Sequence, residues 1–338
     1  MAEWIVGDVH VHSDHCGDGT LSVSEIVERA MPYCDFIAIS GHARQSDNWG
    51  AGQYEDIVRA REQFPGFPIF HTGELEFPIP RHAMVLATPD DGEFDLQREL
   101  VRRFDRLAGV AGIDMACQAM QFVENWSERQ RVVVFNHPNA PDVAFEDLDR
   151  LAAYDSFKVV ACYDRGERRA PQTWDVGAEW DRLLTAGHRV WTRFGSDFHK
   201  HFVDGGNDYY PGEFVQDNLY VQDRSYRSIL AAYRSGSSFC TVNRIVSELT
   251  VRVSTDGLAV SFVANHPIER LEVVSDGRVV AEVHHVGSGP FRRTIPVGPG
   301  RYYRLRGIGA EQERRYTSGT VTPVFVSNPV FWEGLAGA

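Results

Sequence analysis

The feature that most constrains this chain is an alternation of short apolar runs and longer amphipathic segments over about the first 222 residues. The apolar runs cover residues 4–9, 35–40, 68–72, 131–136, 157–163 and 189–194. The helical segments cover residues 21–34, 53–64, 95–108, 114–130, 145–153, 173–186 and 223–235, and Ser22 and Glu25 form a capping box at the start of the first. Strand–helix alternation at this spacing predicts an α/β fold with a parallel sheet and right-handed crossovers, either open or closed into a barrel.

The pattern changes at about residue 239. Short runs rich in Val, Leu and Tyr follow at residues 247–253, 258–264, 270–275, 279–285 and 301–308. The dipeptides Asp256-Gly257 and Asp276-Gly277 stand between pairs of these runs, and such dipeptides are a strong hairpin signal. No Pro/Gly/Ser-rich linker is visible. We therefore expect one domain over residues 1–239 and a small antiparallel β-sandwich over residues 240–338, packed directly together.

Charge and cysteine content exclude several classes of function. The 47 acidic residues outnumber the 34 basic ones, which gives a net charge of −13, and no Lys/Arg cluster offers a face for phosphates. Nucleic acid is therefore not an expected partner. No apolar run reaches the roughly 18–20 residues of a membrane span, and no basic leader is visible, so the sequence predicts a cytoplasmic protein without a membrane partner. Five cysteines without a C-x-x-C motif argue against a disulfide framework or a cysteine-rich zinc site.

Histidine is the unusual component, because ten of the 13 histidines lie within the first 201 residues. His10 and His12 close the first predicted strand, where residues i and i+2 point to the same face. The carboxyl ends of parallel strands form the active-site face of α/β barrels, and imidazoles mixed with carboxylates are typical ligands of Zn²⁺, Mn²⁺ or Fe²⁺. The sequence therefore predicts a metal centre. Its further candidate ligands follow or adjoin later apolar runs: Asp18, His42, Glu74 (with Glu76 two positions later), His82, His137, Asp197 and His199.

These motifs, taken in order, resemble those of a known group of metallohydrolases. The carrying motifs are His10-x-His12, Asp18-Gly19, His42, Glu74, His137-Pro138 and Gly195-Ser196-Asp197-x-His199. They look like the ligand motifs of the PHP (polymerase and histidinol phosphatase) superfamily over about residues 5–240. Residues 12–19, Arg81-His82, residues 233–242 and the C-terminal Ser327-Asn328-Pro329-Val330 are similar to its CehA/McbA branch, which is associated with carbamate and amide hydrolysis. The resemblance implies a distorted (β/α)₇ barrel that carries two or three divalent metal ions.

The resemblance also implies how these ions are held. One ion would take His10, His12, Glu74 and Asp197. A second would share Glu74 with His82 and His137, and a third would take Asp18, His42 and His199. Glu74 is preferred to Glu76 as the shared ligand because it lies eight residues before His82.

The expected chemistry is hydrolysis by metal-activated water. Two neighbouring divalent ions lower the pKa of a bridging water and polarise the bond to be cleaved. Asp197 would accept the proton of the water. His199 or His201 would protonate the leaving group, since an imidazole titrates in the required range.

The loops near these ligands carry candidate substrate contacts, namely Arg44, Trp49, Arg81, Phe198 and Phe202. Aromatic rings over a metal site and a small number of cations favour an uncharged aromatic small molecule, cleaved at an amide or carbamate bond. Two alternatives remain open: a phosphomonoesterase or phosphodiesterase, and a non-catalytic binding module with a vestigial metal site. No nucleotide-binding motif is present, so no nucleotide cofactor is expected. The C-terminal β-domain could mediate dimerisation, so a homodimer is one expected possibility.

Overall fold

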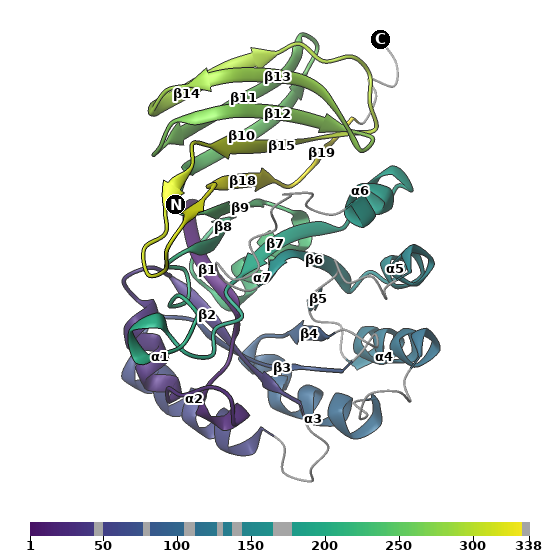
Figure 1. Ribbon diagram of the computed structural model, residues 1–338. Helices are drawn as coiled ribbons and strands as arrows, with labels where there is room; N and C mark the ends of the chain where they lie inside the picture. Colours follow the sequence, from purple (N-terminus) through teal and green to yellow (C-terminus); the bar gives the residue numbers. More distant parts are fainter. Residues whose placement is uncertain are drawn as a thin grey trace.

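The computed structural model describes residues 1–43, 50–76, 82–104, 112–126, 131–136, 144–164 and 178–332. The helices are α1 (Val23–Ala30), α2 (Ala51–Gln63), α3 (Glu93–Phe104), α4 (Ile113–Trp126), α5 (Phe145–Ala152), α6 (Ala178–Thr185) and α7 (Tyr226–Ser235). The strands of the first part are β1 (Glu3–Val11), β2 (Phe36–His42), β3 (Ile69–Glu74), β4 (Ala83–Leu86), β5 (Val132–Phe135), β6 (Phe157–Asp164), β7 (Trp191–Gly195), β8 (Val215–Val221) and β9 (Ser238–Val242). The later strands are β10 (Val246–Ser254), β11 (Gly257–Ala264), β12 (Ile268–Ser275), β13 (Arg278–Val286), β14 (Gly289–Ile295), β15 (Tyr302–Gly309), β16 (Gln312–Glu313), β17 (Thr320–Val321), β18 (Val324–Ser327) and β19 (Val330–Phe331). Helices and strands alternate through the first part, which confirms the α/β prediction (Figure 1).

The strands of the first part are mixed in direction rather than wholly parallel. β1, β2 and β3 run parallel, as do β5, β6 and β7, but β4 is antiparallel to β5 and β8 is antiparallel to β1. Only residues 75–82 separate β3 from β4, and a parallel pair needs a crossover of about a dozen residues or more. An antiparallel bridge between Leu75 and Ala83 joins the two strands instead. The expectation of an all-parallel sheet is therefore wrong at β4 and β8.

The strands of the first part surround a shared apolar core. Buried side chains of β1, β2 and β3 meet those of β4, β5, β6 and β8 in one cluster, to which α7 adds Leu230 and Tyr233. α1 and α2 pack with the opposite faces of β1, β2 and β3, and α3, α4, α5 and α6 cover the other strand group (Figure 1). Among the described residues, no helix is long and apolar enough to cross a membrane.

Both predicted hairpins are confirmed. Asp276 and Gly277 have φ values of 49° and 72°, and their flanking residues Ser275 and Arg278 pair across β12 and β13. Positive φ at both central positions defines a type I′ turn, which matches the twist of paired strands. In the other hairpin Ser254 pairs with Gly257, whose φ of 130° is accessible mainly to glycine.

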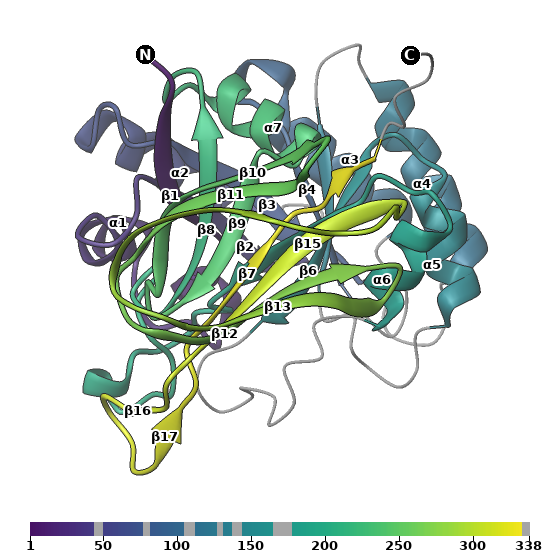
Figure 2. The ribbon, with the colours of Figure 1, turned by 90° about the horizontal axis from the view of Figure 1, so that it is seen from above.

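The C-terminal strands pack directly on the first part (Figure 2). β10, β11 and β14 form one sheet, and its apolar side chains pack with those of β12, β15 and β18 in a common core. β18 pairs with β9 and β9 pairs with β8, so one sheet continues from β13 through to β3. β9 crosses the predicted domain boundary at residues 239/240, and the division stays a prediction.

Candidate metal centre

The described candidate ligands come together although they lie far apart in the sequence. Most of them stand at the carboxyl ends of β1, β2, β3 and β7. These strands end at the same edge of the fold, so the polar side chains at their ends lie close together. They are His10 of β1, His12 directly after β1, His42 of β2, Glu74 of β3, His82 just before β4, Asp197 and His199 just after β7, and Asp18 after the 3-10 helix Asp14–Cys16. His137 lies outside the described residues.

The floor of the centre consists of two imidazoles and two carboxylates. His10 Nε2 lies 3.0 Å from Glu74 Oε1 and 3.2 Å from Asp197 Oδ1. His12 Nε2 lies 3.1 Å from Asp197 Oδ1 and 3.5 Å from Glu74 Oε2. All four residues are buried. Nitrogen and oxygen atoms of four buried side chains converge here, and those of His10, His12 and Asp197 lie within 4.8 Å of one another, a geometry that one small cation can bridge.

The rim of the centre reaches solvent. His82 Nδ1 lies 2.9 Å from Glu74 Oε1, and His42 Nδ1 lies 3.0 Å from Glu74 Oε2. His42 Nε2 lies 3.2 Å from Asp18 Oδ2, and His199 Nε2 lies 3.6 Å from the same oxygen. Glu74 thus contacts histidines of both floor and rim, which favours it over Glu76 as the shared ligand. A substrate can approach from this side, since Asp18 is half exposed.

The charge balance of the centre suits divalent ions. Burial lowers the pKa of His12 to about 4, so its imidazole is neutral at pH 7, which is the form that binds metal. Burial alone would raise the pKa of Asp197, but His10 and His12 outweigh that effect and hold it below its usual range. The carboxylates of Asp18, Glu74 and Asp197 contribute negative charge to the centre. A cation would compensate this charge, and the nitrogen and oxygen donors fit Zn²⁺, Mn²⁺ or Fe²⁺.

Backbone geometry fixes two of the ligands. Asp197 has a φ of 48°, a left-handed conformation that costs a non-glycine residue roughly 1–3 kcal/mol and is concentrated at functional sites. His199 Nδ1 lies 2.7 Å from the carbonyl oxygen of Asp197 and donates its proton there. The lone pair of His199 is therefore on Nε2, the atom that faces Asp18.

Cys16 lies against the centre but is not a nucleophile. Its Sγ is 3.5 Å from His12 Nδ1, so it can orient that imidazole. Burial raises the pKa of Cys16 to about 11, so the thiol stays protonated at neutral pH.

Sequence reasoning missed a layer of buried polar residues behind the ligands. Asn136 Nδ2 donates to Glu74 Oε1 at 3.3 Å, and Arg193 Nη2 donates to Asn136 Oδ1 at 2.6 Å. Both residues are completely buried. The signal in the sequence is an arginine and an asparagine in, or next to, runs that otherwise read as buried strands.

Asp8 belongs to the same layer. Its Oδ1 accepts a hydrogen bond from His10 N at 3.1 Å, and its Oδ2 accepts one from Ser196 N at 3.1 Å. The carboxylate thereby ties the end of β1 to the turn that carries Asp197. The Asp8 side chain is buried, and this burial raises the pKa of its carboxyl group to about 6.

His201 does not join the centre. It is buried, Val203 N donates to its Nδ1 at 3.0 Å, and its Nε2 donates to Glu213 Oε2 at 3.0 Å. Its ring stacks on Tyr210 at 3.8 Å between centroids. With both nitrogens engaged, His201 is placed to brace its loop rather than to protonate a leaving group.

The two described aromatic residues among the expected substrate contacts also lie away from the candidate ligands. Phe198 is completely buried and packs in the core with Val11 rather than over the ligands. Phe202 stacks on Tyr316 at 5.4 Å, in an aromatic cluster beside the β16–β17 hairpin. Both rings lie in packing positions because the loop after β7 folds back on the sheet. Arg44, Trp49 and Arg81 lie outside the described residues.

Fold and site together define a mixed α/β protein with a candidate divalent-metal centre. No family model and no curated protein matches the sequence. Among solved structures, the chain is similar to a two-domain protein from Bacteroides vulgatus that contains a predicted PHP-like metal-dependent phosphoesterase, with 12% identity, 91% of each chain covered and a TM-score of 0.53. This likeness shows that the two chains share a fold.

Two further solved structures are more distant. One is PsfC from Pseudomonas syringae, with 15% identity over 68% of this chain and 89% of that chain and a TM-score of 0.43. The other is a candidate metal-dependent phosphoesterase from Bifidobacterium adolescentis, with 19% identity over 60% of this chain and 90% of that chain and a TM-score of 0.39.

Proposed function

We propose that this protein is a metal-dependent phosphoesterase of the PHP type. The observation that carries the proposal is the buried convergence of His10, His12, Glu74 and Asp197 at the strand ends. Support comes from the fold shared with the Bacteroides protein, which is described as containing a PHP-like metal-dependent phosphoesterase. The CehA/McbA branch remains a finer proposal.

Each part of the centre has its own task in this proposal. The four floor residues would hold one ion, His82 would share Glu74 for a second, and Asp18, His42 and His199 would hold another at the rim. Bound divalent ions supply a Lewis acid and an acidic water. The carboxylate of Asp197 would accept a proton, and His199 would keep its Nδ1 proton on the Asp197 carbonyl oxygen. Asp8 and Asn136 hold these groups in place from behind.

The substrate preference moves from an amide to a phosphoester. An aromatic amide or carbamate was favoured by rings that were expected to project over the metals. Phe198 is instead in the core and Phe202 is in the aromatic cluster, so that reason is lost. A phosphoryl group needs few protein cations here because bound metal ions can hold its oxygens.

The test compares bond types on one protein sample. Metal-depleted protein is reloaded with Mn²⁺, Zn²⁺ or Fe²⁺, and kcat/KM is measured for an aryl phosphate monoester, a diester, an aryl carbamate and an aryl amide. We expect a phosphoester to dominate. His10→Ala should lose more than about 100-fold in kcat/KM, because a lost ligand costs more than a lost neighbour of a ligand. His284→Ala is the matched control, since His284 is an exposed histidine of β13.

Three outcomes would count against the proposal. Dominant carbamate or amide turnover would restore the first interpretation of the sequence. Turnover that survives in His10→Ala would place the activity elsewhere. Failure to bind any divalent metal would favour a binding module.

A further inference from the structure

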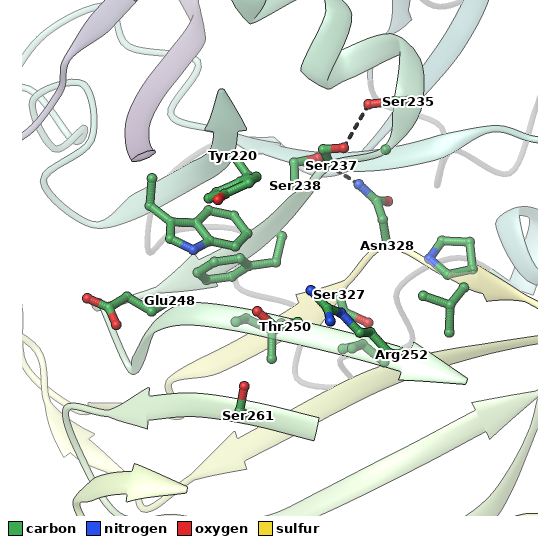
Figure 3. A pocket seen from close by; sticks show the side chains of 17 residues that line it. Tyr220, Ser235, Ser237, Ser238, Glu248, Thr250, Arg252, Ser261, Ser327 and Asn328 are labelled. Atoms are coloured by element: carbon green, nitrogen blue, oxygen red, sulfur yellow. Dashed lines mark hydrogen bonds between the residues drawn. The ribbon is translucent and has the colours of Figure 1, made fainter. Parts of the chain in front are cut away.

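A second site lies at the opposite end of β1. A cavity of about 630 Å³ opens where β8, β9 and the end of α7 meet β10 and the turn after β18 (Figure 3). Trp4 lines it near the start of β1, whereas His10 and His12 stand near the other end of that strand. Trp4 and His10 are six positions apart along β1, which corresponds to roughly 20 Å. A molecule bound in this cavity therefore does not touch the metal centre.

One wall of the cavity is aromatic. The ring centroid of Trp4 lies 5.3 Å from that of Tyr220 and 5.0 Å from that of Phe239. Phe239 is buried and packs against Trp4, whereas Tyr220 is 44% exposed. Figure 3 shows Tyr220 on one side of the opening and Glu248 and Thr250 of β10 on the other. An exposed ring face on a rigid support is a stacking surface.

The opposite wall is a row of polar side chains that the protein itself leaves unused. Glu248, Thr250 and Arg252 of β10 line the cavity, and Ser261 of β11 pairs directly with Thr250. None of these four side chains has a hydrogen-bond or ion-pair partner within the part of the chain that the structure describes. Hydroxyl, carboxylate and guanidinium groups on this wall are therefore available to hydrogen-bond a ligand.

The backbone of this wall is strained where it meets the cavity. The register of β10 and β11 shifts between Ser247 and Thr250, which marks a β-bulge. Within the bulge Glu248 has a φ of 56°, a conformation that non-glycine residues rarely adopt. Bulges of this kind re-aim a side chain, and they are frequent next to functional sites.

The back of the cavity is held in a fixed arrangement. Asn328 Nδ2 donates to Ser238 Oγ at 2.7 Å, and the hydroxyls of Ser235 and Ser237 lie 2.8 Å apart (Figure 3). These bonds leave further lone pairs on the serine oxygens, because a hydroxyl has two. The polar groups of the back wall are thus preorganised rather than mobile.

We propose that this cavity binds a neutral carbohydrate of monosaccharide or disaccharide size. A sugar presents hydroxyls that suit Glu248, Thr250, Arg252 and Ser261, and its C–H face suits the rings of Tyr220 and Trp4. One acidic and one basic side chain balance each other, so a strongly charged ligand gains no net attraction. The volume lies within the roughly 300–1,000 Å³ of small-molecule pockets. The site does not depend on the proposed phosphoesterase activity.

The experiment is a titration of the full chain with named sugars. Glucose, galactose, N-acetylglucosamine, maltose, cellobiose and lactose are tested by saturation-transfer difference NMR and isothermal titration calorimetry. We expect saturable binding of at least one sugar. Tyr220→Ala, Thr250→Val and Arg252→Ala should each weaken it by about tenfold, the factor that the loss of one good contact gives. Arg278→Ala, at an exposed arginine of β13, should bind as the wild type does.

Each alternative outcome overturns the proposal. No saturable binding by the wild type would remove the site. Unchanged binding in all three cavity variants would place the sugar elsewhere, and binding lost only in His10→Ala would place it at the metal centre. Circular dichroism and a melting curve show that each variant is folded, and Thr250→Val keeps the shape of the side chain if Tyr220→Ala fails this control.

Discussion

At the scale of single residues, the contact between Asn136 and Glu74 can be tested most directly. Asn136 Nδ2 donates to Glu74 Oε1, while Asn136 Oδ1 accepts from Arg193. In Asn136→Asp an acceptor replaces the donor and stands beside an anionic carboxylate, at nearly constant shape. We expect affinity for Mn²⁺ or Zn²⁺ to fall by about 10–100-fold, the usual effect of losing a group that orients a ligand. Competition with a chromophoric chelator measures this affinity.

The matched control is Asn265→Asp. Asn265 is exposed, and its Nδ2 donates to the carbonyl oxygen of Arg244, far in sequence from any candidate ligand. Metal affinity should not change in this variant. Equal affinity in Asn136→Asp and the wild type would show that the hydrogen bond to Glu74 has no part in holding metal.

Asp217 gives the protein a pH-dependent stability. Burial raises the pKa of Asp217 to about 7, although Arg193 and hydrogen bonds from Phe194 N and Tyr233 Oη oppose the rise. An unfolded aspartate titrates near 4, so the folded state binds the extra proton between about pH 4 and 7, and stability falls as the pH rises through that range. Asp217→Asn cannot ionise. We expect the difference in free energy of unfolding between this variant and the wild type to grow in favour of the variant as the pH rises to 7, by at most about 1.4 kcal/mol per pH unit.

Urea unfolding at a series of pH values measures this difference. The difference should level off above about pH 7, where Asp217 is ionised in both the folded and unfolded wild-type protein. A gap between the two proteins that does not vary with pH would contradict the assigned pKa.

At this scale the sequence indicated the candidate ligands but not the buried residues that hydrogen-bond to them. His10, Glu74 and Asp197 could be predicted because strand ends and residue types both mark them. Asn136 and Arg193 could not, because their roles depend on partners 62 and 57 positions away. The role of Phe198 was misjudged because an aromatic beside a ligand reads the same whether it faces the site or the core.

At the scale of elements, the close contact of β1 with β2 can be tested at Gly7. Gly7 pairs with Phe36, and a Cβ at Gly7 would stand 2.1 Å from Phe36 Cζ. In Gly7→Ala the strands must separate or the ring must move, and overpacking of this kind costs typically about 1–3 kcal/mol. Because β1 contains His10 and His12 follows it directly, we expect metal affinity to fall together with the free energy of unfolding. Thermal unfolding with and without Mn²⁺ measures both effects.

Gly112→Ala is the control for this change. A Cβ at Gly112, next to the start of α4, would meet nothing within 4 Å. It should leave metal affinity unchanged and stability nearly so. If Gly7→Ala changes stability and metal affinity no more than Gly112→Ala does, the contact between Gly7 and Phe36 is less tight than the structure indicates.

Element identity was more predictable than element direction. The type I′ turn at Asp276-Gly277 is a local property, since two residues with positive φ decide it. The direction of β4 is not local, because Met84-Val85-Leu86 is a short apolar run that fits either a parallel or an antiparallel strand. β14 was missed because Gly289–Ile295 contains Pro290 and two arginines, a composition tolerated at the edge of a sheet.

At the scale of the whole molecule, the continuity of one sheet through both parts was beyond the reach of the sequence. The pairing of β18 with β9 joins residues about 85 positions apart, and no periodicity encodes such a partner. The change of pattern near residue 239 indicated two parts but could not show that β9 would belong to both cores. Phe239 and Cys240 are neighbours in sequence, yet they enter separate clusters.

A buried ion pair clamps the two parts together. Arg304 of β15 donates from Nε to Asp181 Oδ1 of α6 at 2.8 Å and from Nη2 to Asp181 Oδ2 at 2.5 Å, and Tyr302 Oη donates to Asp181 Oδ1 at 2.7 Å. Arg304→Met would leave a buried carboxylate without its cation, and such a loss costs about 3–5 kcal/mol. We expect calorimetry to show a lower melting temperature and a broader or split transition, because α6 and β15 then lose their main polar connection.

A double variant separates the loss of a partner from the loss of packing. In Arg304→Met/Asp181→Leu both charges are gone, so most of the lost stability should return, as it does when apolar groups replace a buried ion pair. Arg150→Met is the exposed control: it breaks a pair with Asp114, and a solvent-exposed pair contributes about 1 kcal/mol or less. A double variant that is less stable than Arg304→Met would show that the charged pair itself, rather than the avoidance of a lone buried charge, holds β15 on α6. The clamp would then be a net source of stability between the two parts, and every substitution at either end should cost about the same.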